Sequence, residues 1–284
     1  MEEILTELNN RAKNIFIEKY VSLPEISKQR LQILNLSLNY ASVPKPLRKV
    51  YCVSTGLIQM GLDLHETVTN QKETHEKNIR KRQLSILTGD YYSSQYYSLL
   101  SRNNLTEEVR KLADAVSNIN IAKMKLYSAD NNFYSIEQAI DLFKIRESNL
   151  YVQFLNLFNT DSVKRFWEFI IENMNFLFKL YQEMNIKNFG KHTFSYFLLN
   201  HHSNVEERKE INESIYNSDL NTKIKNLMRK YDLQGKIDDT IQNIYEKLEN
   251  KINGFEDRLI QKELFFTLNQ FNNIFHLDKA VEKI

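Results

Sequence analysis

The sequence has few of the residues that interrupt helices or cross-link chains. Its 284 residues include six glycines, three prolines and one cysteine, Cys52. Scarce glycine and proline favour long, uninterrupted helices. A lone cysteine excludes an internal disulfide and a cysteine-based zinc site, and it is typical of a reducing compartment. We therefore expect a cytoplasmic protein.

An excess of charge of one sign is also missing. The 38 basic and 36 acidic side chains give a formal net charge of +2, so no strong field would attract nucleic acid. The N-terminus shows no secretory signal pattern. The most apolar stretch, residues 166–184, is interrupted by Glu168, Glu172, Lys179 and Glu183. We expect no nucleic-acid partner and no transmembrane segment.

Helical periodicity is present along most of the chain. Apolar residues recur at three- and four-residue steps, as in Ile237, Ile241, Ile244, Leu248 and Ile252. No segment alternates polar and apolar residues between turn glycines, so nothing predicts a sheet. No linker divides the sequence. These patterns predict an all-α fold, a single-domain helical bundle over residues 1–284.

Helix starts and connections have their own signals. Hydroxyl residues stand three positions before a carboxylate or amide at Ser22 with Glu25, Ser135 with Gln138, and Ser203 with Glu206. Each pair predicts a capped helix start. Stretches rich in Asn, Ser, Gly or Pro predict connections at residues 42–46, 101–106, 128–134, 186–192 and 233–236.

Two predicted helices are apolar on more than one face. One carries Tyr91, Tyr92, Tyr96, Tyr97 and Leu100, and the other covers residues 166–181. Such helices must be covered on several sides. The second is predicted to be central. For the tyrosine helix, either a second chain covers the excess or one crowded core does.

Few residues are candidates for chemistry. No glycine-rich phosphate loop and no nucleophile in a strained turn can be recognised. Arg80, Lys81 and Arg82 form a compact basic cluster that could contact a diphosphate, because arginine presents a planar fork of donors. The alternative is a solvated helix start. The residues alone therefore predict no catalytic centre.

A family resemblance is carried by GLDLHETV followed by RKRQLSILTGDYYSSQYYSLL. This order resembles the trans-polyprenyl diphosphate synthases, and most closely the component 1 family of bacterial two-component heptaprenyl diphosphate synthases. The resemblance covers about residues 57–275 and implies the isoprenoid synthase fold. Residues 1–50 are divergent N-terminal helices without a good counterpart of the isopentenyl diphosphate site.

The resemblance also shows where acidic motifs are degenerate. Where active synthases carry HDDVxD, this chain has a degenerate first motif of His65, Glu66, Thr67 and Asn70. Where they carry FQxxDD, it has a degenerate second motif of Phe178, Lys179, Gln182 and Glu183. Their lysine-threonine pair falls on Arg146 and Glu147. Magnesium needs several oxygen anions, so we expect no catalytic residue and no metal in this chain.

The resemblance further implies a partner. Component 1 pairs with a catalytic component 2, on which Mg²⁺ is expected, and the pair makes a heptaprenyl or hexaprenyl diphosphate for the menaquinone side chain. The isoprenoid substrate would be bound mainly by the partner. Tyr91, Tyr92, Tyr96, Tyr97 and Leu100 are the candidate partner interface. The alternatives are a self-sufficient Mg-dependent prenyltransferase with altered motifs and a general helical adaptor.

Overall fold

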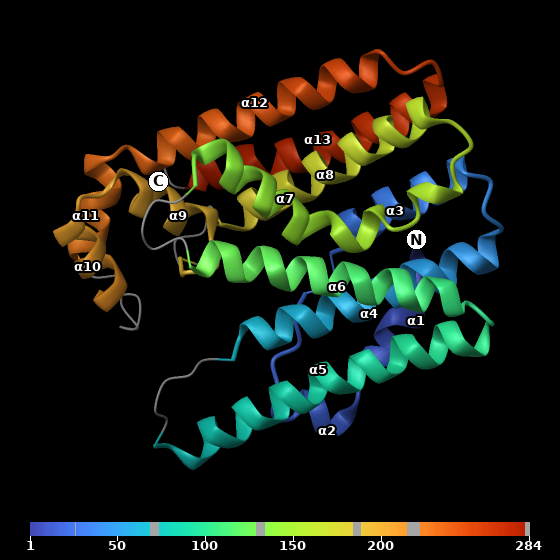
Figure 1. Ribbon diagram of the computed structural model, residues 1–284, viewed down its shortest axis with the longest axis horizontal. Helices are drawn as coiled ribbons and strands as arrows, with labels where there is room; N and C mark the ends of the chain where they lie inside the picture. The colour runs from blue at the N-terminus through green and yellow to red at the C-terminus, as the bar shows by residue number, and fades with distance from the viewer. Residues whose placement is uncertain (26, 69–73, 129–133, 184–188, 215–221, 282–284) are drawn as a thin grey trace. The chain divides into compact units, whose positions relative to one another are not determined.

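The computed structural model describes the chain except for residues 26, 69–73, 129–133, 184–188, 215–221 and 282–284 (Figure 1). From residue 271 onward it describes the backbone and not the side chains. Its described residues contain no strand, which confirms the all-α prediction. The helices are α1 (Glu2–Ala12), α2 (Ile15–Glu18), α3 (Lys28–Tyr40), α4 (Lys45–Glu66), α5 (Glu76–Arg102), α6 (Thr106–Tyr127), α7 (Ile136–Val152), the 3-10 turn η2 (Leu155–Leu157), α8 (Asp161–Glu183), α9 (Phe194–His202), α10 (Val205–Ser214), α11 (Thr222–Lys230), α12 (Leu233–Asn253) and α13 (Arg258–Val281).

The helices form two compact units. Unit 1 comprises Met1–Asp114 and Asn156–Phe158, and unit 2 comprises Ala115–Leu155 and Asn159–Ile284. The division falls within α6. Each unit is described by itself below, and the interpretation of residues 1–284 as one domain stays a prediction.

Unit 1 is organised around α4. This helix packs against α1, α3 and α5, and its residues from Tyr51 to Ile58 are all buried. Two glycines permit the close approach. A methyl group at Gly56 would lie 2.6 Å from Leu8 Cδ2 of α1, and one at Gly61 would lie 3.3 Å from the carbonyl oxygen of Gly89 on α5.

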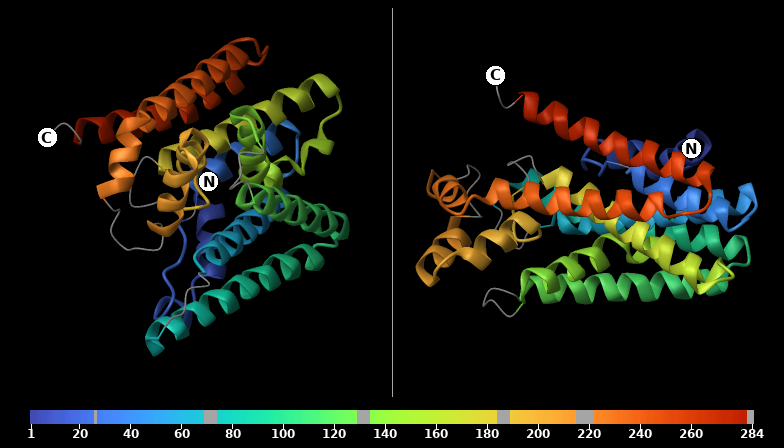
Figure 2. Two further views of the ribbon diagram at one scale, coloured as in Figure 1. Left: turned by 60° about the vertical axis from the view of Figure 1, so that its left-hand side comes forward. Right: turned by 90° about the horizontal axis from the view of Figure 1, so that it is seen from above.

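Unit 2 is organised around α8, which contacts α7, α9, α12 and α13. The two further views in Figure 2 show α12 running beside α8. Rings of Phe143, Phe176 and Phe194 meet with centroids 5.4–6.1 Å apart, at distances favourable for aromatic pairs. Trp167 and Leu177 are fully buried. The prediction that residues 166–181 form a central helix is therefore confirmed for unit 2.

The predicted helix starts have mixed outcomes. Ser135 and Gln138 form the predicted capping box of α7. The other two predictions were wrong in register, because α3 is capped by Ser27 and α10 by reciprocal hydrogen bonds between Asn204 and Glu207. The predicted connection at residues 233–236 was also wrong. α12 already begins at Leu233, and the turn before it uses Asp232 at a positive φ of 46°.

None of the helices in the described part of the chain is both long enough and apolar enough to cross a bilayer.

Candidate functional site

The degenerate first motif lies at the C-terminal end of α4 in unit 1. His65 and Thr67 are exposed and Glu66 is half-buried, while Asn70 lies outside the described residues. The Thr67 hydroxyl donates to the Leu64 carbonyl at 2.7 Å, so it closes the helix end instead of facing a ligand. The structure thus places one carboxylate, Glu66, among the three described positions of this motif.

His65 instead packs over the neighbouring helix. Its imidazole lies against Gly89 of α5, where an added methyl would come 2.5 Å from Nε2. The same nitrogen lies 3.9 Å from Oδ1 of Asp90. His65 therefore packs against Gly89 and lies near Asp90, and this contact is part of the packing of α4 against α5.

The degenerate second motif lies at the end of α8 in unit 2. Glu183 is buried, and its Oε2 accepts hydrogen bonds from the backbone N–H and hydroxyl of Ser195, at 3.2 and 3.4 Å. Its Oε1 lies 3.9 Å from Lys179 Nζ. Burial raises the pKa of the Glu183 carboxyl, and the charges of Lys179 and Arg146 oppose that rise. Gln182 is exposed and Phe178 half-buried.

A second buried ion pair belongs to unit 2. Arg146 Nε lies 2.7 Å from Oε1 of Glu147, and the two side chains are only 4% and 7% exposed. Another guanidinium nitrogen of Arg146 donates to the His192 carbonyl. The guanidinium also lies 4.7 Å from the centre of the Phe143 ring. The Arg146 guanidinium is thus occupied by contacts within the chain.

The donors of these two motifs do not fit a magnesium cluster. Among the described residues, no group of three or more His, Cys, Asp or Glu side chains is arranged to hold a metal ion. Hard divalent cations need several oxygen ligands at short distances. Here the retained carboxylate Glu183 shares its surroundings with the ammonium of Lys179.

The basic cluster lies near the start of α5. Arg80 and Lys81 are exposed, and Arg82 is half-buried. Arg80 donates to Glu76 one turn earlier at 2.7 Å, an exposed pair of the kind that contributes little to stability. Contact of this cluster with a diphosphate stays a prediction.

The candidate interface residues of α5 differ in exposure. Tyr92 and Leu100 are fully buried in this chain, and the hydroxyls of Tyr91 and Tyr92 donate to the carbonyls of Arg11 and Ala12 at the end of α1. Because Tyr92 and Leu100 are covered within this chain, their side chains cannot contact a partner unless this part of the chain unfolds. The α5 outer face, which we define as Ile86, Leu87 and Tyr97, is 40%, 61% and 57% exposed.

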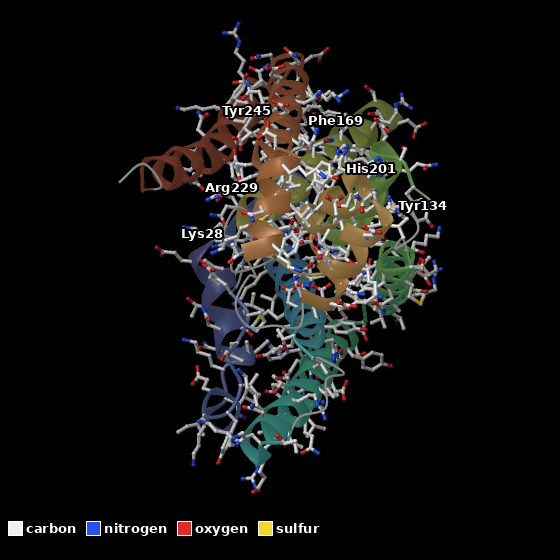
Figure 3. All side chains as sticks on the ribbon, turned by 90° about the vertical axis from the view of Figure 1, so that its left-hand side faces the viewer. Lys28, Tyr134, Phe169, His201, Arg229 and Tyr245 are labelled. Atoms are coloured by element: carbon white, nitrogen blue, oxygen red, sulfur yellow. The ribbon has the colours of Figure 1, made fainter. Side chains whose placement is uncertain are left out.

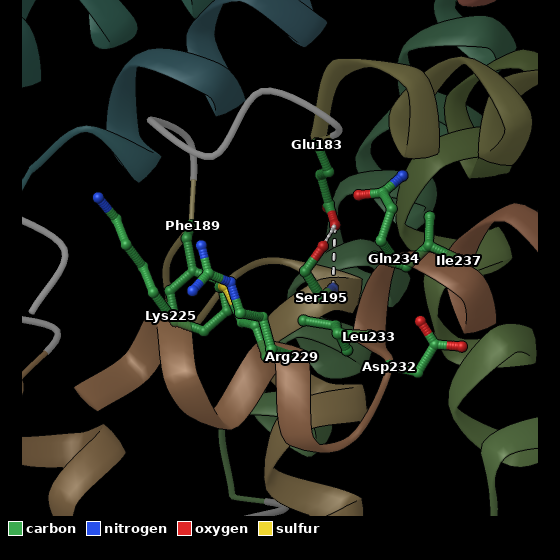
Figure 4. Close-up of a pocket in the computed structure, with 10 residues that line it drawn as sticks. Glu183, Phe189, Ser195, Lys225, Arg229, Asp232, Leu233, Gln234 and Ile237 are labelled. Carbon is green, nitrogen blue, oxygen red and sulfur yellow. Dashed lines mark hydrogen bonds between the residues drawn. The ribbon is translucent and has the colours of Figure 1, made fainter. Parts of the chain in front are cut away.

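Unit 2 also contains a pocket beside Glu183 with a volume of about 440 Å³. Its lining residues come from α8, α9, α11 and α12 and from the connections that contain Phe189 and Asp232, and Figure 4 shows them as sticks. Glu183 and Ser195 supply polar atoms, Lys225 and Arg229 supply cations from α11, and apolar surface comes from Phe189, Met228, Leu233 and Ile237. Figure 3 shows where Arg229 projects from α11.

Glu207 of α10 fixes the helix that carries the pocket's cations. Its carboxylate accepts hydrogen bonds from Lys230 Nζ at 2.7 Å and from the Tyr231 hydroxyl at 2.6 Å. These bonds, with one from the Asn204 backbone N–H, lower the pKa of Glu207 to about 2. The Glu207 side chain is 14% exposed, whereas that of Lys230 is 56% exposed, so the carboxylate is the more buried partner.

We expect this contact to make stability depend on pH. A carboxyl whose pKa is lower in the folded than in the unfolded state stabilises the fold above its unfolded pKa of about 4.3, and that contribution is lost as the pH falls toward 2. Between pH 5 and pH 2.5, the free energy of unfolding measured in urea should therefore fall less for Glu207→Gln than for the wild type. Equal losses would contradict the assignment.

No pattern in the sequence pointed directly to this pocket. Lys225 and Arg229 stand in a segment without a recognisable motif, and they meet Ser195 only because α9, α11 and α12 fold around the end of α8. A four-residue spacing does place Lys225 and Arg229 on one helical face. That signal fits a solvated face equally well, so it could not have identified a site.

Comparison with known proteins decides the family. The family described as "Heptaprenyl diphosphate synthase (HEPPP synthase) subunit 1" matches residues 15–232. The chain belongs to this family. Among curated proteins, heptaprenyl diphosphate synthase component 1 of Geobacillus stearothermophilus is 44% identical over 71 residues. That alignment covers 25% of this chain and spans 30% of the relative's length.

Solved structures show the same fold. Geranylgeranyl pyrophosphate synthase from Bacteroides thetaiotaomicron has a TM-score of 0.70 at 14% identity, with 95% of this chain and 96% of that chain covered. Heptaprenyl diphosphate synthase from Staphylococcus aureus has a TM-score of 0.68 at 12% identity, with 96% of each covered. The chain therefore has the isoprenoid synthase fold that the resemblance predicted.

Proposed function

We propose that this chain is the non-catalytic subunit of a two-component long-chain prenyl diphosphate synthase. It would pair in the cytoplasm with a catalytic component 2 that holds Mg²⁺ and most of the isoprenoid substrate. The product would be a heptaprenyl diphosphate, or a hexaprenyl diphosphate, for the menaquinone side chain.

One observation carries this proposal. The retained acid of the second motif, Glu183, is turned inward and held by Ser195 and Lys179. Ionisation of an allylic diphosphate requires preorganised positive charge at the leaving group, which magnesium supplies in the related synthases. A buried carboxyl with a raised pKa beside an ammonium is a poor ligand for that ion.

The α5 outer face supports the pairing. Ile86, Leu87 and Tyr97 lie within an arc of about 100° on the helix, at about 100° per residue. Large apolar side chains exposed on one arc are typical of a surface that another protein covers. This face, rather than Tyr92 and Leu100, is the part of α5 that can contact component 2.

The test is reconstitution. The purified chain, a purified candidate component 2 and their mixture are each given farnesyl and isopentenyl diphosphates with Mg²⁺, and the products are identified. We expect turnover only in the mixture. Elongation by this chain alone would support the self-sufficient prenyltransferase, and an unchanged mixture would support a general adaptor.

Replacing Leu87 and Tyr97 together with Ala is expected to weaken pairing by roughly 30-fold or more, because central interface anchors contribute about 2 kcal/mol or more. Titration of labelled chain with component 2 measures this. The isolated variant should keep its unfolding free energy within about 0.5 kcal/mol, as exposed substitutions usually do.

The matched control for this pair is Leu259→Ala. Leu259 is 77% exposed in unit 2, so its replacement removes an exposed apolar side chain outside α5. Equal affinities of the α5 variant and this control for component 2 would show that the α5 outer face is not the interface.

A further inference from the structure

The pocket beside Glu183 presents two cations that no acid of the described chain neutralises. Lys225 and Arg229 line it from one face of α11 and form no ion pair within the described residues. The other cations of this helix behave differently. Lys223 pairs with Glu210 at 3.1 Å, and Lys230 pairs with Glu207 at 2.7 Å. The helix thus divides its charges between internal contacts and the pocket.

The acid on the same rim forms no ion pair with these cations within the described part of the chain. Asp232 lines the pocket, but its Oδ1 accepts a hydrogen bond from the Gly235 backbone N–H as the N-cap of α12. In Figure 4 it lies on the other side of Leu233 from Arg229. An anionic group would therefore meet two cations at the α11 side of the pocket that have no ion-pair partner among the described residues.

The remaining walls are apolar. Phe189, Met228, Leu233 and Ile237 contribute them, and the volume of about 440 Å³ lies within the range of small-molecule sites. A simple inorganic anion would leave these walls in contact with water. A ligand that combines an anionic head with an apolar tail would use both parts of the lining.

The inner end of the pocket has an incompletely bonded polar group. Glu183 is 6% exposed and lines the pocket, and its Oε1 has no hydrogen-bond partner, although Lys179 Nζ lies 3.9 Å away. Buried polar atoms normally find such a partner. Because the carboxylate accepts hydrogen bonds and repels anions, an anionic head belongs at the α11 side of the pocket and not at this end.

We propose that this pocket binds a short prenyl diphosphate directly, through Lys225 and Arg229, without a bridging divalent ion. The two cations match a diphosphate head, for which arginine offers paired donors. The apolar walls match the first isoprene units. The choice of a prenyl tail rests on the proposed function, whereas the anionic head and apolar tail rest on the pocket itself.

Calorimetric titration of the purified full chain with farnesyl diphosphate in EDTA tests the proposal. EDTA removes the magnesium on which metal-bridged binding depends. We expect saturable binding, and we expect Lys225→Gln/Arg229→Gln to bind at least tenfold more weakly, because a charged hydrogen bond is worth about 1.5–3 kcal/mol. The matched control is Lys223→Gln, which removes a cation of α11 that pairs with Glu210 and should bind as the wild type does.

Two further ligands separate the parts of the site. Inorganic diphosphate and farnesol should each bind at least tenfold more weakly than farnesyl diphosphate. No saturable binding in EDTA, or equal affinities for the double variant and the Lys223→Gln control, would overturn the proposal. So would a fragment that binds as tightly as the whole ligand. Circular dichroism confirms that the variants, which change exposed residues, remain folded.

These outcomes are separable from those of the reconstitution test. A chain that restores turnover to component 2 but does not bind farnesyl diphosphate in EDTA would retain its proposed function and lose this site. A chain that binds the ligand without restoring turnover would keep the site and lose the function.

Discussion

Arg146→Met is expected to lower the free energy of unfolding of the isolated chain by about 3–5 kcal/mol. Removing one partner of a buried ion pair leaves the other charge in a poorly hydrated interior, and breaking such pairs has effects of this size. The remaining charge here would be Glu147, whose side chain is 7% exposed. The His192 carbonyl would lose its guanidinium donor as well. Urea denaturation followed by circular dichroism measures the change.

Two controls show whether burial is the cause. Arg146→Met/Glu147→Leu removes both charges, so it should recover a large part of the loss. Arg110→Met breaks pairs with Glu107 and Asp114 whose side chains are more than half exposed, and its effect should be much smaller, because water screens exposed pairs. Similar effects of Arg110→Met and Arg146→Met would contradict the buried-pair explanation.

The position of Arg146 also bears on function. The resemblance places it where active synthases carry a lysine, so a retained cation suggests a retained diphosphate contact. Its guanidinium is instead occupied by Glu147, His192 and the Phe143 ring. The positive charge of Arg146 therefore serves contacts within unit 2. This agrees with the proposed non-catalytic role of the chain.

The helices of this chain could be predicted from sequence because their signals are local. The apolar spacing of residues 166–181 determines that α8 is buried on several sides, whichever helices surround it. Ser135 and Gln138 form a capping box within one turn, so their pattern is also self-sufficient. The exact first residues of α3 and α10 were missed, because several polar residues near each start could serve as the cap.

The candidate site depends on contacts between distant segments, and these could not be predicted. The tyrosines of α5 indicated that several of its sides are covered, but not that Tyr92 faces the end of α1, 80 positions earlier. Lys179 stands among the positions of the degenerate second motif. That Glu183 would bond to Ser195 depends on how the chain returns after α8, and no spacing rule describes that return.

Tyr92→Ala is expected to destabilise the isolated chain by about 3–5 kcal/mol, the range for deleting a large buried aromatic side chain. Its ring is fully buried, and its hydroxyl donates to the Ala12 carbonyl at 3.1 Å. The last carbonyls of a helix lack partners within it, so this hydroxyl helps to hold the end of α1. Thermal and urea unfolding of the chain without component 2 measure the loss.

Tyr92→Phe and Tyr97→Ala separate folding from pairing. The phenylalanine variant keeps the ring and leaves the Ala12 carbonyl unpaired, so it should lose about 1–3 kcal/mol. Tyr97 is 57% exposed, so its replacement should change the isolated chain by less than about 0.5 kcal/mol while weakening pairing. If Tyr92→Ala left the isolated chain as stable as the wild type and only pairing failed, Tyr92 would belong to the interface, because a side chain that closes unit 1 cannot be removed without a loss of stability.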